Sequence, residues 1–293
     1  TDMTHSPKCK QRRRRRWWPW LLLLAAFFCI ALYRSNKTLS VERYTFADPA
    51  LPAGFEGLRI VQLSDLHGAV FGEDNADLIA AVAAEEPDLI VLTGDLQDRF
   101  RETPPQYTWD LGAAMAAIAP TYFVTGNHEW AVGDVPELKE GLAEAGVTVL
   151  SNTYTVLERG GDRLVLAGID DPNGYADQKT PEELAEEIRQ EQGDVPWLLL
   201  AHRNNLFEDR YSALGADLVI SGHGHGGMIR LPFTDGLIGV DRTLFPSYTD
   251  GFYAHNGARV FVSRGLGSSG PSFRLFNRPQ VAVLTLTGEE APS

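Results

Sequence analysis

Cysteine is almost absent from this chain of 293 residues. Cys9 lies in a basic stretch and Cys29 inside an apolar run, so residues 30–293 contain none. This distribution excludes a disulfide framework and a metal site built from thiolates. Any metal site in the folded part must therefore use histidine, carboxylate and amide side chains.

Basic residues are scarce beyond the N-terminus. The first 40 residues hold nine lysines and arginines and one acid, which leaves 17 bases and 38 acids for the rest, a net charge of −21. Such an acidic domain repels polyphosphate backbones at long range, so no nucleic-acid partner is expected. The chain also lacks repeats of fixed period, and about 250 residues remain beyond the N-terminal segment, enough for one large domain.

The N-terminal segment joins a basic stretch to an uncharged run. Arg12 to Arg16 are consecutive arginines, residues 17–33 read WWPWLLLLAAFFCIALY, and Arg34 and Lys37 follow. The run is at the short limit for spanning a bilayer, its aromatic ends suit the interface, and positive charge stays on the cytoplasmic side. We therefore predict four segments of a single-pass cell-membrane protein: a basic cytoplasmic tail (1–16), a transmembrane signal anchor (17–33), a linker (34–50) and an extracytoplasmic domain (51–293).

Two alternatives stay open for this segment. Cys29 and Ala31 form a weak small-x-small site for signal-peptide cleavage. The paired arginines before the apolar run also permit twin-arginine export. A buried core helix is disfavoured, because the five arginines would have to be buried with it.

Apolar runs of strand length alternate with helical patterns along the domain, which indicates an α/β class with a largely parallel sheet. Five continuous runs are typical of strands buried on both faces: 58–63, 88–92, 121–125, 197–201 and 217–220. The helical stretches end at proline or glycine, and the last two begin with capping boxes: 75–86, 109–119, 134–146 and 180–193.

Later apolar runs lack regular helices between them. They predict a second set of strands, and hence a sandwich: 148–150, 154–158, 163–168, 259–263 and 281–286.

Each of the five buried runs ends at a residue type that binds metals. These residues are Asp65, Asp95, Asn127, His202 and His223. Five of the seven histidines fall at these ends, and the carboxyl ends of strands are where α/β sheets bind ligands. A single loop histidine is usually a surface or packing residue, but five at one topological position predict a shared site.

The residue types favour two metal ions. Asp65 and His67, like His223 and His225, are one residue apart and should alternate as strand side chains do. Asp95 follows a glycine that permits a sharp turn, and a carboxylate can bridge cations about 3.5–4 Å apart. Such a pair lowers the pKa of a bridging water toward about 7. Mixed nitrogen and oxygen ligands suit two divalent ions of Mn, Fe or Zn better than Mg or Ca.

Five short motifs occur in a fixed order, each after a predicted strand. They are DLH (65–67), GDLQD (94–98), GNHE (126–129), AH (201–202) and GHGHGG (222–227). Together they resemble the calcineurin-like metallophosphoesterase family, and within it the bacterial membrane-anchored phosphohydrolases. The resemblance implies a four-layer αββα sandwich with a dinuclear metal site at the C-terminal ends of its strands.

The resemblance also implies a role for each matching residue. The implied ligands are Asp65, His67 and His225 for the first metal, Asn127, His202 and His223 for the second, and Asp95 as the bridge. His128 would be catalytic, protonating the leaving oxygen or stabilising the transition state, and Asp98 would orient it.

Two positions depart from the usual pattern. Arg99 stands where related protein phosphatases place a phosphate-binding arginine, but Phe100 replaces their glycine, which leaves that role open. Gly224 separates the last two histidines where the family more often has threonine, which loosens the loop without altering its ligands.

The implied activity is metal-dependent hydrolysis of phosphate esters, of phosphodiesterase or pyrophosphatase type, by a hydroxide that bridges the metals. The anchor predicts a substrate linked to lipid or cell wall, and residues 230–256, rich in aromatic residues and leucine, could form an apolar wall or a packed connection. A broad phosphomonoesterase, a nuclease and a non-catalytic binding module are the alternatives. The complete ligand set argues against the module, and the negative charge argues against the nuclease.

Overall fold

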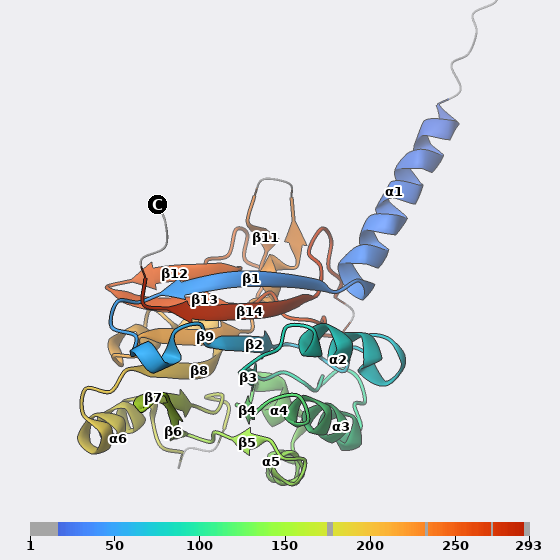
Figure 1. Ribbon diagram of the computed structural model, residues 1–293. Helices are drawn as coiled ribbons and strands as arrows, with labels where there is room; N and C mark the ends of the chain where they lie inside the picture. Colours follow the sequence, from blue (N-terminus) through green and yellow to red (C-terminus); the bar gives the residue numbers. More distant parts are fainter. Residues whose placement is uncertain (1–16, 175–177, 232–233, 271, 290–293) are drawn as a thin grey trace, which may run out of the picture.

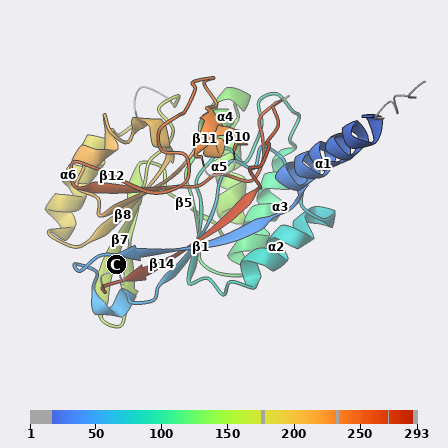
Figure 2. The same cartoon turned by 90° about the horizontal axis from the view of Figure 1, so that it is seen from above.

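The computed structural model describes residues 17–174, 178–231, 234–270 and 272–289. The predicted basic tail, residues 1–16, lies outside the described residues. Helix α1 (Trp18–Lys37) opens the described chain and projects away from the domain (Figures 1 and 2). Its length and composition would allow it to cross a membrane, a test that a signal sequence also passes.

Residues 34–50, predicted as a linker, are part of the fold. Helix α1 continues through Lys37, and strand β1 (Ser40–Ala47) pairs in parallel with β14 (Gln280–Thr287) along its whole length. The folded domain therefore begins at Ser40 rather than at residue 51. The partner strand β14 is more than 230 residues away in the sequence, so no local pattern could predict this pairing.

The first sheet has six strands in the order β1-β14-β2-β3-β4-β5. Its other four strands are β2 (Arg59–Leu63), β3 (Leu89–Leu92), β4 (Thr121–Phe123) and β5 (Thr148–Val149). Strands β2 to β5 are parallel, whereas β14 is antiparallel to β2. The carboxyl ends of β2, β3 and β4 consequently lie along one edge.

The second sheet also has six strands, in the order β12-β13-β9-β8-β7-β6. They are β6 (Thr153–Arg159), β7 (Asp162–Gly168), β8 (Trp197–Arg203), β9 (Leu218–Gly222), β12 (Gly251–His255) and β13 (Ala258–Val262). Strands β7, β8, β9 and β13 are parallel, with antiparallel β6 and β12 at the edges. The five buried runs are thus divided between two sheets. The later apolar runs, predicted to form a second set of strands, do not all lie in one sheet, because β5 and β14 belong to the first sheet.

Helices cover the outer face of each sheet, which gives four layers. On the first sheet these are α2 (Ala76–Ala83), α3 (Pro105–Ala116) and α5 (Val135–Glu144), and on the second sheet α6 (Pro181–Gln192). A short helix, α4 (Asn127–Val132), follows β4, and a small hairpin joins β10 (Ile229–Arg230) to β11 (Gly236–Ile238). The αββα sandwich is therefore confirmed.

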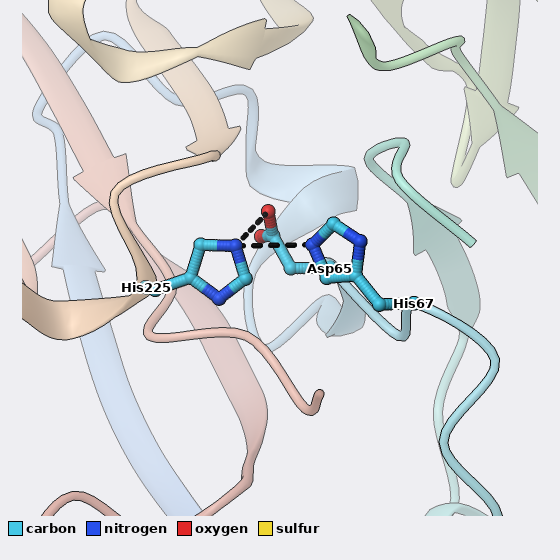
Figure 3. A group of neighbouring side chains, drawn as sticks. All are labelled: Asp65, His67 and His225. Carbon is cyan, nitrogen blue, oxygen red and sulfur yellow. Dashed lines mark hydrogen bonds and ion pairs between the residues drawn. The ribbon is translucent and has the colours of Figure 1, made fainter. Parts of the chain in front are cut away.

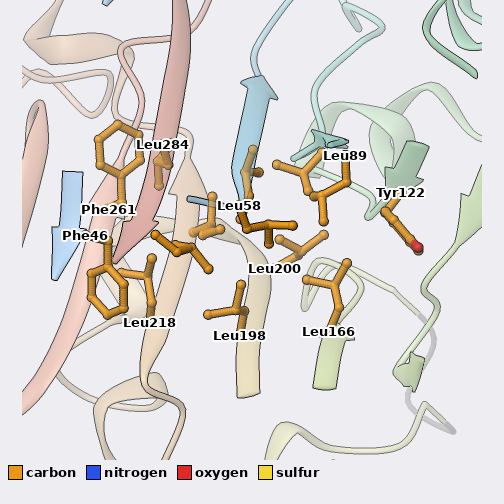
Figure 4. Packing of buried hydrophobic residues seen from close by; sticks show 14 of the residues in the cluster. Phe46, Leu58, Leu89, Tyr122, Leu166, Leu198, Leu200, Leu218, Phe261 and Leu284 are labelled. Carbon is orange, nitrogen blue, oxygen red and sulfur yellow. The ribbon is translucent and has the colours of Figure 1, made fainter. Parts of the chain in front are cut away.

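Apolar side chains fill the space between the two sheets (Figure 4). On β8, Leu198 and Leu200 point into this central core while Leu199 packs toward α6. Both faces of the strand are buried, which explains the continuous apolar run in the sequence. The packed core holds the two sheets in one relative position and so fixes the edge at which their carboxyl ends meet.

Candidate metal centre

The predicted ligands come from both sheets. Asp65 follows β2 and Asp95 follows β3, whereas His202 lies on β8 and His223 follows β9. Asn127 begins α4 directly after β4. The site therefore lies where the edges of the two sheets adjoin.

Five of the ligand positions have unusual backbone conformations. The φ angles are 52° at Asp65, 49° at His67, 54° at Asp95, 68° at His223 and 48° at His225. These left-handed values are rare for side chains other than glycine and collect at functional sites. The expected strand-like alternation of each Asp/His or His/His pair was therefore wrong, since the loops after the strands turn back to aim the side chains.

The first group of side chains contains Asp65 and His67 from the first motif and His225 from the last motif. The Nε2 atoms of His67 and His225 are 3.0 Å apart, and His225 Nε2 is 3.5 Å from Asp65 Oδ1 (Figure 3). One ligand atom from each residue fits within a sphere suited to a single ion. This is the trio predicted for the first metal.

The second group lies beside the first and contains Asp95. His202 Nε2 is 3.2 Å from Asp95 Oδ2 and 3.2 Å from His223 Nδ1. The same Asp95 oxygen is 3.7 Å from His67 Nε2 in the first group. Asp95 thus stands between the two groups, the position that a bridging carboxylate requires.

Asn127 completes the predicted set. It lines the same cavity as Asp95, His223 and His225, and its Oδ1 is buried without a hydrogen-bond partner among the described residues. A buried carbonyl oxygen without a donor is costly, so a cation is a fitting partner for it.

The charges of the site also favour cations. Burial, with Asp95 nearby, raises the pKa of Asp65 to about 6. Burial lowers the pKa of His202, but the Asp95 carboxylate outweighs that effect and raises the pKa to about 10. Both shifts reflect negative charge buried at the site, which a bound cation would offset. With this nitrogen and oxygen donor set, the residues fit a pair of divalent ions.

His128 lies next to the groups rather than inside one predicted trio. Its backbone N–H donates to Asp95 Oδ1 at 2.8 Å, and its Nδ1 is 3.1 Å from Asp98 Oδ1. Burial lowers the pKa of His128 against the opposing effects of Asp95 and Asp98. Because His128 also falls within ligand distance of His67 and Asp95, geometry alone allows it to be a ligand or a proton donor.

Asp98 is held by the backbone on both oxygens. Gly270 N donates to Oδ2 at 2.8 Å and Phe100 N to Oδ1 at 3.2 Å. Burial raises the pKa of Asp98, but these hydrogen bonds outweigh it and the pKa is lowered. The carboxylate is therefore a fixed negative group beside the His128 ring.

Glu129, the last residue of the GNHE motif, is a buried residue to which the resemblance gives no role. It is fully buried and accepts hydrogen bonds from Gly126 N at 2.7 Å, Asp95 N at 2.9 Å and Gln97 N at 3.1 Å. It ties the loop after β3 to the loop after β4. Its position in GNHE was a signal for this role, since the motif places it beside two predicted site residues.

A cavity of about 780 Å³ opens over the site. Beyond the predicted ligands, its wall contains Arg99, Arg242 and apolar side chains, including Phe100, Val240 and Phe273. The expected wall from residues 230–256 is present over residues 238–242, whereas His255 lies on β12 and does not line this cavity. The cavity thus offers cationic and apolar surface together.

Comparison with known proteins agrees with this geometry. The profile of the Calcineurin-like phosphoesterase family matches residues 58–227, a range that contains every motif residue. The chain belongs to this family of metallophosphoesterases, which are enzymes that hydrolyse phosphate esters.

Several relatives match along most of the domain. An uncharacterized metallophosphoesterase of Aquifex aeolicus is 31% identical over 255 residues, which cover 86% of this chain and 93% of that protein. The phosphodiesterase YaeI of Escherichia coli is 32% identical over 249 residues, 82% of this chain and 84% of that protein. A transmembrane protein with metallophosphoesterase domain from Danio rerio is 30% identical over 247 residues, 80% of this chain and 54% of that protein.

Proposed function

We propose that this protein is a dinuclear phosphodiesterase or pyrophosphatase that acts beside a membrane. The central position of Asp95 between two groups of ligand atoms carries the proposal. In this proposal the first metal is held by Asp65, His67 and His225, and the second by Asn127, His202 and His223. Two such ions, of Mn, Fe or Zn, supply the Lewis acidity that activates water and neutralises phosphoryl charge.

The residues around the ions have separate tasks. His128 protonates the leaving oxygen through Nε2, while Asp98 on its Nδ1 side orients the ring. Asp95 and Glu129 hold the loops that carry His128 and Asn127, so that little reorganisation is needed during reaction.

The cavity wall supports an amphiphilic substrate. Arg99 and Arg242 provide positive charge for phosphate oxygens outside the ligand set, and Phe100, Val240 and Phe273 provide an apolar surface. Phe273 is 52% exposed, so this surface continues to the outside of the domain. We infer a phosphate ester linked to lipid or to a cell-wall precursor.

The apolar helix supports a location at the cell membrane. Phe27 of α1 packs against Phe276 with ring centroids 6.1 Å apart, and Phe276 lies three residues beyond Phe273. The helix would span the membrane once, with the N-terminus cytoplasmic and the domain extracytoplasmic. The cavity would then open close to the leaflet surface.

A substrate comparison tests the activity. The full chain, in detergent and loaded with Mn²⁺ or Zn²⁺, is assayed on bis(p-nitrophenyl) phosphate, p-nitrophenyl phosphate and a diester with one long alkyl arm. We expect diester turnover, with kcat/KM highest for the alkyl diester. Turnover of the monoester alone would identify a phosphomonoesterase instead, and no turnover of any compound would contradict a phosphoesterase of this type.

A further inference from the structure

Arg274 is an arginine in an unusual environment. Its side chain is 0% exposed, and among the described residues no carboxylate lies within ion-pair distance of it, although the charge of Asp65 acts on it from further away. Burial of a guanidinium without an acidic partner is costly, so the contacts that hold it there need an explanation.

The guanidinium contacts the first ligand group. Its Nε and Nη2 donate to Gly267 O at 2.8 and 2.6 Å, and Nη2 is 3.0 Å from His225 Nδ1. Gly267 N in turn donates to Asp65 O at 2.6 Å. Arg274 therefore ties together the backbone beside Asp65 and the ring of His225, while among the described residues its hydrogen bonds reach none of the second group.

The ring of His225 is held on its Nδ1 side, where Arg274 Nη2 and Gly267 O both lie close. Nε2 faces Asp65 and His67, so it can bind a cation only when the ring proton is on Nδ1. Arg274 Nη2, 3.0 Å from Nδ1, can only donate, so it cannot accept that proton. With the proton on Nδ1, Gly267 O at 3.3 Å is the acceptor, and Arg274 directs its N–H groups to the same oxygen in two hydrogen bonds. Partners of this kind orient a metal-binding histidine and set its tautomer.

Arg274 is held in turn by the end of α1. Asn36 Nδ2 donates to Arg274 O at 2.8 Å, and Arg274 N donates to Asn36 Oδ1 at 3.0 Å. This two-point contact joins the last turn of the apolar helix to the segment behind the metal site. A displacement of α1 would therefore move the backbone of Arg274 and, through it, the support of His225.

We propose that Arg274 is a positioning residue for His225 and that Asn36 couples the apolar helix to cation binding at the first metal position. The inference rests on the proposed ligand roles of Asp65, His67 and His225. It adds that a change at the base of α1 alters cation affinity at the first metal position and not at the second.

Metal titration of the full chain in detergent tests the coupling. The variants are Arg274→Lys, which keeps the charge but loses the two-atom grip on Gly267 O, and Asn36→Ala. The matched controls are Arg278→Lys, at an arginine that contacts Thr38 O, and Asn256→Ala, at an exposed asparagine beside His255. Mn²⁺ binding is followed by calorimetry and by the electron paramagnetic resonance signal of the coupled ion pair.

We expect the two variants to bind one Mn²⁺ as the parent does and the other about 10–100-fold more weakly, a typical effect of losing an outer partner of a ligand. The controls should bind both ions normally. The coupling would be overturned if Asn36→Ala, with an unchanged thermal melt, bound both ions as the parent does or lost both ions equally. This test remains valid even if Arg274→Lys fails to fold. A parent protein that binds fewer than two ions would instead contradict the proposed dinuclear site itself.

Discussion

At the scale of single residues, Asp95 organises the site through its side chain and its backbone. One carboxylate oxygen faces His202 and His67, the other accepts from His128 N, and the Asp95 N–H donates to Glu129. A Cβ on Gly126 would lie 2.2 Å from Asp95 Oδ1, so no larger residue fits there without displacing the carboxylate. Charge, hydrogen bonding and packing therefore all place the same oxygen atoms.

Substitutions at Asp95 and His128 separate metal binding from proton transfer. Asp95→Asn removes the charge shared by both groups and should abolish turnover with loss of both ions. His128→Asn should lower kcat by about 10²–10⁴-fold with both ions retained, because a proton donor contributes about that much. Metal content by mass spectrometry, measured with kcat on the same samples, checks both. Equal metal loss in the two variants would refute this division and favour His128 as a ligand.

At the scale of elements, two helix starts with similar sequences differ. Thr180 caps α6, since its side-chain oxygen accepts from Glu183 N at 3.1 Å and the Glu183 carboxylate accepts from Thr180 N at 2.8 Å. The capping box predicted for α5 was wrong. Asp134 has a left-handed φ of 52°, and its side chain makes no capping hydrogen bond in the described structure.

The difference predicts unequal effects of two substitutions. Thr180→Ala should lower the free energy of unfolding by about 1 kcal/mol, because a backbone N–H in the first turn of α6 loses its acceptor. Asp134→Asn, at the position without a cap, should change it by less than about 0.5 kcal/mol, since asparagine tolerates the left-handed region. Urea unfolding followed by circular dichroism gives both values. A loss for Asp134→Asn as large as that for Thr180→Ala would contradict the assignment of the caps.

At the scale of the whole molecule, a charged cluster joins the two sheets outside the apolar core. Arg264, after β13, forms ion pairs with Glu42 on β1 and with Asp250 before β12. Burial raises the pKa of Glu42, but the hydrogen bonds and charge of Arg264 outweigh it and lower the pKa to about 2. The cluster fastens the edge strand β1 to the opposite sheet.

The lowered pKa of Glu42 predicts a pH dependence of stability. Since the folded value is below the ordinary value of 4.5, the contribution of Glu42 is present above pH 4.5 and is lost as pH falls toward 2. Glu42→Gln should lower the free energy of unfolding at pH 7 by about 1 kcal/mol, given the partial exposure of the pair. The difference in free energy of unfolding between Glu42→Gln and the parent should become smaller as pH falls from 4.5 to 2.

Unfolding curves across this pH range check the prediction. Glu158→Gln, at an exposed position on β6, is the control and should follow the parent at every pH. A gap for Glu42→Gln that stays constant down to pH 2 would show that the carboxylate does not contribute through this ion pair.

Much of the fold and of the candidate site was accessible from local patterns. The runs ending at Asp65, Asp95 and His223 are strands because continuous apolar residues bury both faces of a strand. Their ends were expected to meet because parallel strands share an edge. By contrast, the sequence patterns predicted neither strand β1 nor the contact of Arg274 with the site. β1 depends on a partner at the far end of the chain, and Arg274 belongs to a segment without periodic pattern.

The sequence by itself predicted the candidate site residues and their position at the carboxyl ends of strands, because residue type, spacing and burial pattern are local properties. Only the tertiary structure decided how the strands divide between two sheets, how left-handed turns aim the side chains, and that Asn36 reaches Arg274 behind His225. These features depend on contacts between residues far apart in the chain, whose geometry is set by packing of the common core.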